Sequence, residues 1–447
     1  MNAMTPRRWR RAGVVACLLA LVATALTAVA PAGAATAPSG FAPVVFVHGQ
    51  QGSAQQWQSN AKRFSVNGYA DDLLHAYEYD SSITTDDQAI AGLDEFIAGV
   101  RARTGAPQVD LIAHSRGTGI AQAYLGTPAR AATVRRYVNV DGRTSATPPG
   151  GVPTLALWSS LQPNGSIGGA TNVHLPNSAH TESTTSAEGF GHIFRFLRDR
   201  PATTTAVLPE LPGQVVIAGR AALYPQNRGL VGQLRVWLLD DRTGARVGAP
   251  AHSVTTGADG SFGPLRVDGR AHYEAELVRP GELVHHFYFE PFERSDRFVR
   301  LPVASPGGVA DQVDRCPGHS AFTVIRNREW WGDQLAPGAD DRLRFDGVDV
   351  VTAATAPRLR QVIGAFVFDD GCDGVSAPGL VLPPFALLPF VTGTDLRVPA
   401  QPDAGRTVRV TETVRGSGGA TRTIAARNWP SDQHSITVQF KDYVDIG

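Results

Sequence analysis

A short apolar run that leads into a serine constrains this chain more than any other feature. The residues are Leu111, Ile112, Ala113, His114, Ser115, Arg116 and Gly117. The apolar start is typical of a buried strand, and the glycines that follow the serine open a helix. A serine between the two must sit on a sharp, strained turn, so the residues two before and two after it have to be small, as Ala113 and Gly117 are. The pattern predicts a strand, a tight turn and a helix, with the Ser115 hydroxyl raised above a sheet.

Strand and helix patterns alternate from residue 43 to residue 200. The strand candidates are residues 43–48, 73–79, 109–113, 137–140, 154–158 and 172–175. Apolar residues recur at helical spacing in residues 87–103, and two further helices are expected at 115–125 and 190–198. This alternation predicts a mostly parallel sheet with helices on both faces, which is an α/β fold for residues 35–200.

The pattern changes near residue 200. Residues 201–213 hold three prolines and three consecutive threonines, and we interpret them as a linker. Beyond them, alternating apolar runs end at turns such as Asp240-Asp241-Arg242-Thr243-Gly244. We expect a β-sandwich-like domain at 214–303 and a C-terminal β-domain at 304–447.

The N-terminus has the pattern of an export signal. Arginines stand at positions 7, 8, 10 and 11, an uncharged apolar run covers residues 12–30, and Ala32-Gly33-Ala34 follows. This predicts a signal peptide at 1–34 that is cleaved near Ala34, and a secreted protein; the alternative is a membrane anchor, since the run is just long enough to span.

After cleavage, Cys316 and Cys372 remain, and an even pair in an exported chain predicts one disulfide.

A nucleophilic serine needs a base, and the base needs an acid that orients it. Asp141 directly follows a strand candidate and is the expected acid, although an aspartate before Gly142 could simply form a turn. His180, in the loop after the strand at 172–175, is the expected base, because catalysts gather at the carboxyl ends of parallel strands. The rival bases are His174, in mid-strand, and His192, in the last helix.

The developing oxyanion needs two backbone N–H donors. One is expected from Arg116, the residue after the serine. The second is expected from Gln50, in the loop His48-Gly49-Gln50-Gln51-Gly52-Ser53. The alternative for this loop is an ordinary glycine turn.

Other features exclude several classes of protein. The formal net charge is zero and no basic stripe is interleaved with aromatic residues, so no nucleic-acid partner is expected. Residues 369–374 superficially resemble a calcium loop but lack its spacing and terminal glutamate, which favours a disulfide-tied turn; no metal and no cofactor are predicted. His285 and His286 are expected at the surface.

Several motifs together resemble a known family. They are Gly52-Ser53, Gly68-Tyr69, Tyr77-Glu78-Tyr79-Asp80, Phe368-Asp369-Asp370-Gly371, Asp395-Leu396-Arg397-Val398-Pro399 and the tail from Trp429 to Tyr443. The chain is similar to extracellular α/β-hydrolase lipases, most of all to archaeal long-chain triacylglycerol lipases with a C-terminal β-domain. The resemblance implies a nucleophile at Ser115, an acid at Asp141, a base at His180, and oxyanion donors at Gln50 and Arg116.

The chain departs from that family in two places. Ala113 stands where the family usually has glycine. Only residues 81–108 separate the strand candidate that ends at Tyr79 from the one that enters the turn, which is room for one helix. We therefore expect no helical lid insertion there, and the resemblance supports an esterase more firmly than a true lipase.

The sequence thus predicts a secreted serine carboxylic-ester hydrolase that works through an acyl-enzyme. Two alternatives stay open: an extracellular polyester depolymerase with the same residues, and a β-rich binding protein with a degenerate hydrolase domain. The expected partner is an ester or lipid substrate. Contact with a lipid interface is left open, and no obligate protein partner is expected.

Overall fold

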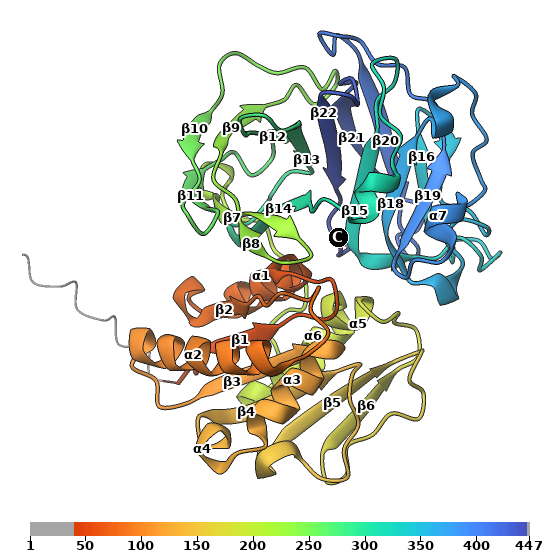
Figure 1. The fold of residues 1–447 in the computed structure, drawn as a ribbon. Coiled ribbons are helices and arrows are strands. Elements are labelled where there is room, and N and C mark those ends of the chain that lie inside the picture. The colour runs from red at the N-terminus through yellow and green to blue at the C-terminus, as the bar shows by residue number, and fades with distance from the viewer. Residues whose placement is uncertain (1–39, 445–447) are drawn as a thin grey trace, which may run out of the picture. The chain divides into compact units, whose positions relative to one another are not determined.

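Six parallel strands form the sheet that carries Ser115. The computed structural model describes residues 40–444. The strands are β1 (Val44–Val47), β2 (Leu74–Tyr77), β3 (Val109–His114), β4 (Val134–Val140), β5 (Thr154–Ser159) and β6 (Thr171–Leu175). Their order is β2-β1-β3-β4-β5-β6, and every neighbouring pair is parallel (Figure 1). The predicted α/β fold is confirmed, and β3 brings the serine turn to the interior of the sheet.

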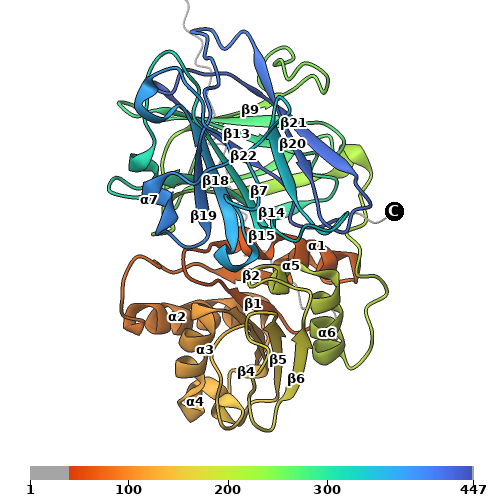
Figure 2. The same cartoon turned by 90° about the vertical axis from the view of Figure 1, so that its right-hand side faces the viewer.

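Helices cover both faces of this sheet (Figure 2). They are α1 (Gln58–Val66), α2 (Asp87–Thr104), α3 (Arg116–Leu125), α4 (Pro128–Ala131), α5 (Glu182–Thr185) and α6 (Ala187–Arg198). On one face, α1 and α6 pack their aromatic side chains into the cluster that holds Phe46 and Val138. On the other face, α2 and α3 pack against Val45 and Leu111. Burial on both sides explains why these strands are continuous apolar runs without a polar face.

The segment between β2 and β3 is short. Residues 78–108 are all described, and α2 is the only helix in them. This agrees with the expectation that a separate lid insertion is missing at this point.

The β-sheets of the second half begin after residue 214. The first strands are β7 (Val216–Tyr224), β8 (Arg228–Gly229), β9 (Gln233–Leu238), β10 (His252–Thr255), β11 (Ser261–Arg266), β12 (Tyr273–Val278), β13 (Val284–Phe289) and β14 (Asp296–Ala304). The later elements are β15 (Phe322–Trp330), β16 (Arg342–Phe345), β17 (Val348–Asp349), β18 (Val362–Phe368), α7 (Pro383–Ala386), β19 (Val391–Asp395), β20 (Thr407–Thr413), β21 (Thr421–Arg427) and β22 (His434–Gln439). The predicted C-terminal β-structure is confirmed.

One eight-stranded sheet runs through both predicted β-domains. Its order is β10-β9-β12-β13-β22-β15-β18-β19, so β22 lies between strands from the two halves and pairs in parallel with both. The sheet β11-β7-β14 shares an apolar core with one part of it, and the sheet β17-β16-β20-β21 shares a core with the other. The two halves are therefore joined by backbone hydrogen bonds, and the described residues all lie in a single compact unit.

Residues 201–213 are fastened to the α/β part rather than free. Asn67 accepts the N–H of Thr203 at 2.7 Å through its side-chain oxygen, and its amide donates to Thr204 O at 2.8 Å. Arg63 Nε donates to Thr205 O at 2.7 Å, and Val207 is buried. The segment predicted to be a linker thus has fixed contacts with α1 and the turn after it.

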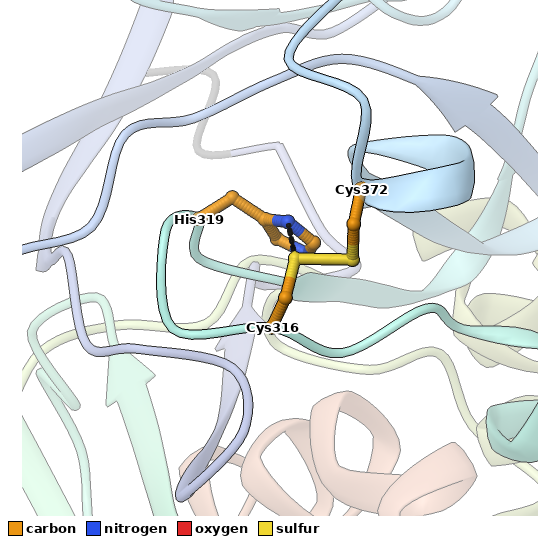
Figure 3. Close-up of side chains that lie close together, drawn as sticks. All are labelled: Cys316, His319 and Cys372. Carbon is orange, nitrogen blue, oxygen red and sulfur yellow. Dashed lines mark hydrogen bonds between the residues drawn. A yellow bond between two sulfur atoms is a disulfide. The ribbon is translucent and has the colours of Figure 1, made fainter.

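The predicted disulfide is present between Cys316 and Cys372, with 6.4 Å between the two Cα atoms (Figure 3). The ring of His319 lies beside it, with Nδ1 2.9 Å from Cys316 Sγ. Among residues 40–444 these three side chains form the one group spaced for a metal ion, and the disulfide already occupies both sulfur atoms.

The surface position expected for His285 and His286 is wrong. His286 has no exposed surface, and its Nδ1 lies 2.6 Å from Glu274 in the neighbouring strand β12. The side chains of His285 and His286 point to opposite faces of β13, and other parts of the chain cover both faces. The sequence of the strand alone could not reveal this burial.

The predicted signal peptide and its cleavage near Ala34 lie outside the described residues. Among residues 40–444, no helix is both long and apolar enough to cross a membrane.

Replacing Cys316 and Cys372 together with serine is expected to lower the free energy of unfolding by about 2–4 kcal/mol, because the unfolded chain regains the freedom of a long loop. Thermal unfolding of the double variant, and of the wild-type protein with and without dithiothreitol, measures the loss. A Tm that is the same for all three samples would contradict a stabilising role of the disulfide.

Candidate active site

The turn at Ser115 has the strained backbone that the sequence predicted. Ser115 has φ 51° and ψ −125°, directly before the first residue of α3. Its N–H donates to Val140 O at 3.0 Å, which ties the turn to β4. A Cβ at Gly117 would lie 2.4 Å from His48 O, so only glycine permits this approach of α3 to β1. The small residues around the serine are therefore required by packing as well as by the dihedrals.

Asp141 and His180 lie in direct contact. Asp141 Oδ2 is 2.5 Å from His180 Nδ1, and the aspartate is fully buried at the end of β4. Ser159, at the end of β5, donates its N–H to Asp141 Oδ1 at 2.7 Å and its hydroxyl to Oδ2 at 2.6 Å. The contact fixes which imidazole nitrogen faces the aspartate, and it leaves Nε2 for another partner. Ser159 escaped the sequence analysis, although its position at the next strand end was a usable signal.

The rival histidines are placed elsewhere. His174 Nε2 lies 3.1 Å from Gly165 O, and His192 is on α6; neither lines the cavity that holds Ser115. Ser115 and His180 both line that cavity. Within residues 40–444 no hydrogen bond joins Ser115 Oγ to His180 Nε2; contacts of this kind are often long and tighten only with substrate bound.

His114, inside the serine motif, supports the His180 loop. Its Nε2 lies 3.1 Å from His180 O, and its Nδ1 lies 2.5 Å from the side-chain nitrogen of Gln56. Since a carbonyl only accepts, Nε2 carries the proton and Nδ1 accepts from Gln56. Burial lowers the pKa of His114 well below its usual range, so the ring stays neutral beside His180.

The loop after β1 approaches the serine closely. A Cβ at Gly49 would lie 3.0 Å from Ser115 Cβ, so a side chain there would crowd the nucleophile. Within residues 40–444, neither the N–H of Gln50 nor that of Arg116 donates to another residue. Both residues belong to segments that flank Ser115, which is the arrangement expected of two oxyanion donors.

The side chain of Arg116 fastens this region, a role the sequence did not reveal. Its Nη1 donates to Gln50 Oε1 at 2.7 Å and to Ser81 O at 3.0 Å, and its Nη2 donates to Ile83 O at 2.7 Å. It also pairs with Asp86 at 2.8 Å. The side chain of Arg116 therefore ties the start of α3 to the loop that carries Gln50, the second expected donor.

The same loop is held from the β-sheets. Asn227 Nδ2 donates to Gly52 O at 3.0 Å and to Tyr79 O at 3.1 Å. Glu78, directly after β2, pairs with Arg300 at 2.7 Å and accepts the N–H of Ala54 at 2.8 Å. Burial alone would raise the pKa of Glu78, but Arg300, the N–H of Ala54 and Arg220 together outweigh burial, and the pKa falls to about 2. The carboxylate thus stays charged and keeps the two parts of the chain together.

The cavity above Ser115 has a volume of about 810 Å³ and is built by both parts of the chain. The α/β part contributes Gly49, Gln50, His114, Ser115 and His180. Apolar walls from the β-sheets include Leu223, Leu230, Val303, Phe322, Phe366 and Val391. Charged side chains also line it, among them Arg279, Asp311 and Arg315. The ring of Phe390 stacks near His180, with 6.3 Å between the ring centres.

Three family models match successive parts of this chain. Residues 41–133 match the family model of class 2 lipases, and residues 213–306 match the lipase C-terminal domain. A further C-terminal domain model matches residues 308–444. A search of the curated proteins finds no match.

The similar solved structures are distant. A predicted CIB-like hydrolase from Thermoplasma acidophilum is 18% identical over 36% of this chain and 88% of that one, with a TM-score of 0.27. An epoxide hydrolase from Vigna radiata is 13% identical over 36% of this chain and 92% of that one, with a TM-score of 0.25.

The parallel sheet, the turn at Ser115 and the class 2 lipase match define this chain as a hydrolase of the α/β type. Within that class, the resemblance found in the sequence is confirmed: the chain resembles lipases and esterases that carry a C-terminal β-domain.

Arg116→Lys keeps the charge and the backbone N–H but loses the planar fork that holds Gln50. We expect kcat on a soluble p-nitrophenyl ester to fall about tenfold with KM little changed, since an oxyanion donor acts mainly on the transition state. Arg130→Lys is the matched control, because Arg130 pairs with Asp94 on the outside of the sheet. Equal kcat values for the two variants would contradict the role of the Arg116 side chain.

Proposed function

We propose that this protein is a secreted serine carboxylic-ester hydrolase, a lipase or carboxylesterase. The observation that carries the proposal is the contact of His180 Nδ1 with the buried Asp141, in a loop that lines one cavity with the strained Ser115. A serine on such a turn, a histidine and a buried aspartate are the three groups that acyl transfer requires.

In the proposed acylation step, Ser115 Oγ attacks the ester carbonyl while His180 Nε2 takes the hydroxyl proton. Asp141 holds the imidazole in the required orientation and stabilises its positive charge. The N–H groups of Gln50 and Arg116 donate to the oxyanion. His180 then returns the proton to the leaving alcohol, and Ser115 carries the acyl group.

In the deacylation step, water takes the place of the alcohol. His180 removes a proton from the water, whose oxygen attacks the acyl carbon. The tetrahedral intermediate again places its oxyanion at Gln50 and Arg116, and its collapse releases the carboxylic acid and restores the Ser115 hydroxyl. None of these steps needs a metal or a cofactor.

The shape of the cavity supports discrete esters over a solid polymer. Its apolar walls, which include Val303, Phe366 and Val391, come from strands of the β-sheets. An acyl chain can fill such a cavity and bury apolar surface there. A polyester film would need an open surface around Ser115, so we place the depolymerase second.

Secretion is part of the proposal. The disulfide between Cys316 and Cys372 is of the kind that persists in oxidising compartments. Together with the arginine-rich, apolar N-terminus of the sequence, it supports export of the protein.

Ser115→Ala is expected to lower kcat/KM on short p-nitrophenyl esters by at least about a thousandfold, the scale of losing a nucleophile. The variant should also fail to react with a fluorophosphonate probe that labels the wild-type protein. Ser435→Ala is the control, since Ser435 lines the same cavity from β22. A Ser115→Ala variant that keeps near wild-type rates would exclude Ser115 as the nucleophile.

The rate should depend on acyl chain length in the way an apolar cavity requires. Across a series of p-nitrophenyl esters, we expect kcat/KM to rise with chain length until the cavity is filled, because each added methylene buries more apolar surface. A series in which acetate is the best substrate and every longer chain is worse would argue against an acyl site in this cavity.

A further inference from the structure

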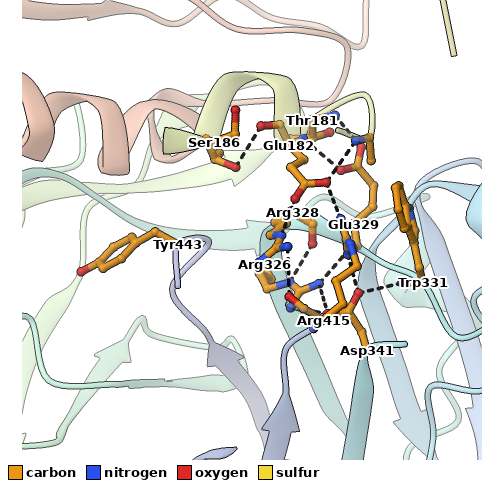
Figure 4. A network of polar contacts seen from close by, with 12 residues as sticks. Thr181, Glu182, Ser186, Arg326, Arg328, Glu329, Trp331, Asp341, Arg415 and Tyr443 are labelled. Carbon is orange, nitrogen blue, oxygen red and sulfur yellow. Dashed lines mark hydrogen bonds and ion pairs between the residues drawn. The ribbon is translucent and has the colours of Figure 1, made fainter. Parts of the chain in front are cut away.

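A fully buried carboxylate from the β-sheets contacts the loop of His180. Glu329 is in β15, and its side chain is buried completely. Its Oε1 accepts the N–H of Thr181, and its Oε2 accepts the N–H of Glu182 at 3.0 Å (Figure 4). These are the first two backbone N–H groups after His180, so a residue almost 150 positions away fixes the loop next to the proposed base.

The residue before His180 is held by the same cluster. The N–H of Ala179 donates to Glu182 Oε2 at 3.0 Å. Glu182 in turn accepts Arg328 Nε at 2.7 Å and pairs with Arg415. The backbone N–H groups on both sides of His180 therefore donate to buried carboxylates. One of these, Glu329, lies on a strand of the β-sheets, and the other, Glu182, pairs with arginines from them.

The arginines of this cluster are themselves anchored. Arg415 Nη1 donates to Glu329 O at 2.5 Å and pairs with Asp341. Asp341 also accepts Arg326 Nη1 at 3.2 Å and the N–H of Trp331 at 2.9 Å (Figure 4). All of these side chains are buried, and the ion pairs that Asp341 makes with Arg326 and Arg415 hold this part of the cluster rigidly.

Glu329 differs from the other carboxylates of the cluster. Among residues 40–444 it has no arginine, lysine or histidine nitrogen within 4.0 Å, whereas Glu182 and Asp341 have two arginines each. Burial raises the pKa of Glu329, and the N–H of Thr181 and the nearby His180 oppose that rise. A buried carboxylate without a cationic partner is costly, which points to a purpose other than stability.

We propose that Glu329 is a positioning residue for His180. It holds the loop through the N–H groups of Thr181 and Glu182. Its negative charge also favours the imidazolium that forms when His180 takes the proton of Ser115. The inference rests on the function proposed above and makes β15 a part of the catalytic apparatus, although Glu329 touches no reacting atom.

Two substitutions separate position from charge. Glu329→Gln keeps the shape but removes the charge and one of the two acceptors. We expect kcat to fall at least about tenfold with KM little changed, since a misplaced base impairs the chemical step. The acid limb of kcat/KM should move to lower pH, because loss of a nearby negative charge makes His180 easier to deprotonate. Glu329→Asp keeps the charge but shortens the reach, so kcat should fall while the acid limb stays in place.

Glu274→Gln is the matched control. Glu274 is also a fully buried glutamate on a strand, but it pairs with Arg246 and His286, away from the cavity. This control should lower the Tm and leave kcat and the acid limb per folded molecule unchanged. Folded Glu329→Gln with wild-type kcat and an unmoved acid limb would overturn the proposal.

Hydrogen exchange on the wild-type protein tests the same contact without any variant, should the substitutions prevent folding. The N–H groups of Thr181 and Glu182 are expected to exchange as slowly as those of β15, and exchange as fast as in an exposed loop would overturn the proposal. The two proposals fail separately: an active Ser115→Ala removes the proposed function, whereas an inactive Ser115→Ala beside a normal Glu329→Gln removes only the role of Glu329.

Discussion

The geometry of the candidate site depends on a close approach between the backbone of α3 and the end of β1. The strained turn at Ser115 is stable only because Gly117 lets the start of α3 press against the end of β1, and because Gly49 leaves room beside the serine. The central place of β3 in the sheet then brings Asp141 from the next strand, and the His180 loop after β6, to the same edge. The geometry of the candidate site thus follows from two places where any side chain would clash.

The α/β part supplies the candidate catalytic groups, and the β-sheets contact the loops that carry them. Asn227 holds the loop that carries Gln50, Arg300 holds the residue after β2, and Glu329 holds the residues after His180. The same sheets form the apolar walls of the cavity above Ser115. The second half of the chain therefore belongs to the site as much as to the scaffold.

Local patterns in the sequence were enough to predict the α/β fold, the turn at Ser115 and the disulfide. The first two depend on neighbouring residues, and the third depends on there being an even number of cysteines after the predicted signal peptide. Asp141 and His180 followed from the order of strands. The roles we assign to Glu329 and Asn227 left no such signal, since they arise only when strands far apart in sequence meet. His285 and His286 were misplaced for the same reason, because burial on the second face of a strand depends on what later folds over it.

The position of β22 has a consequence for how the protein is made. It is the last described strand in the chain, yet it lies between β13 and β15 in the middle of the large sheet. Until residues 434–439 have been synthesised and folded, both neighbours present open edges that can pair with other chains. The strand that carries Glu329 is one of them. We therefore expect a chain that ends shortly before β22 to be aggregation-prone and inactive. Hydrolytic activity should appear only after β22 has paired with β13 and β15.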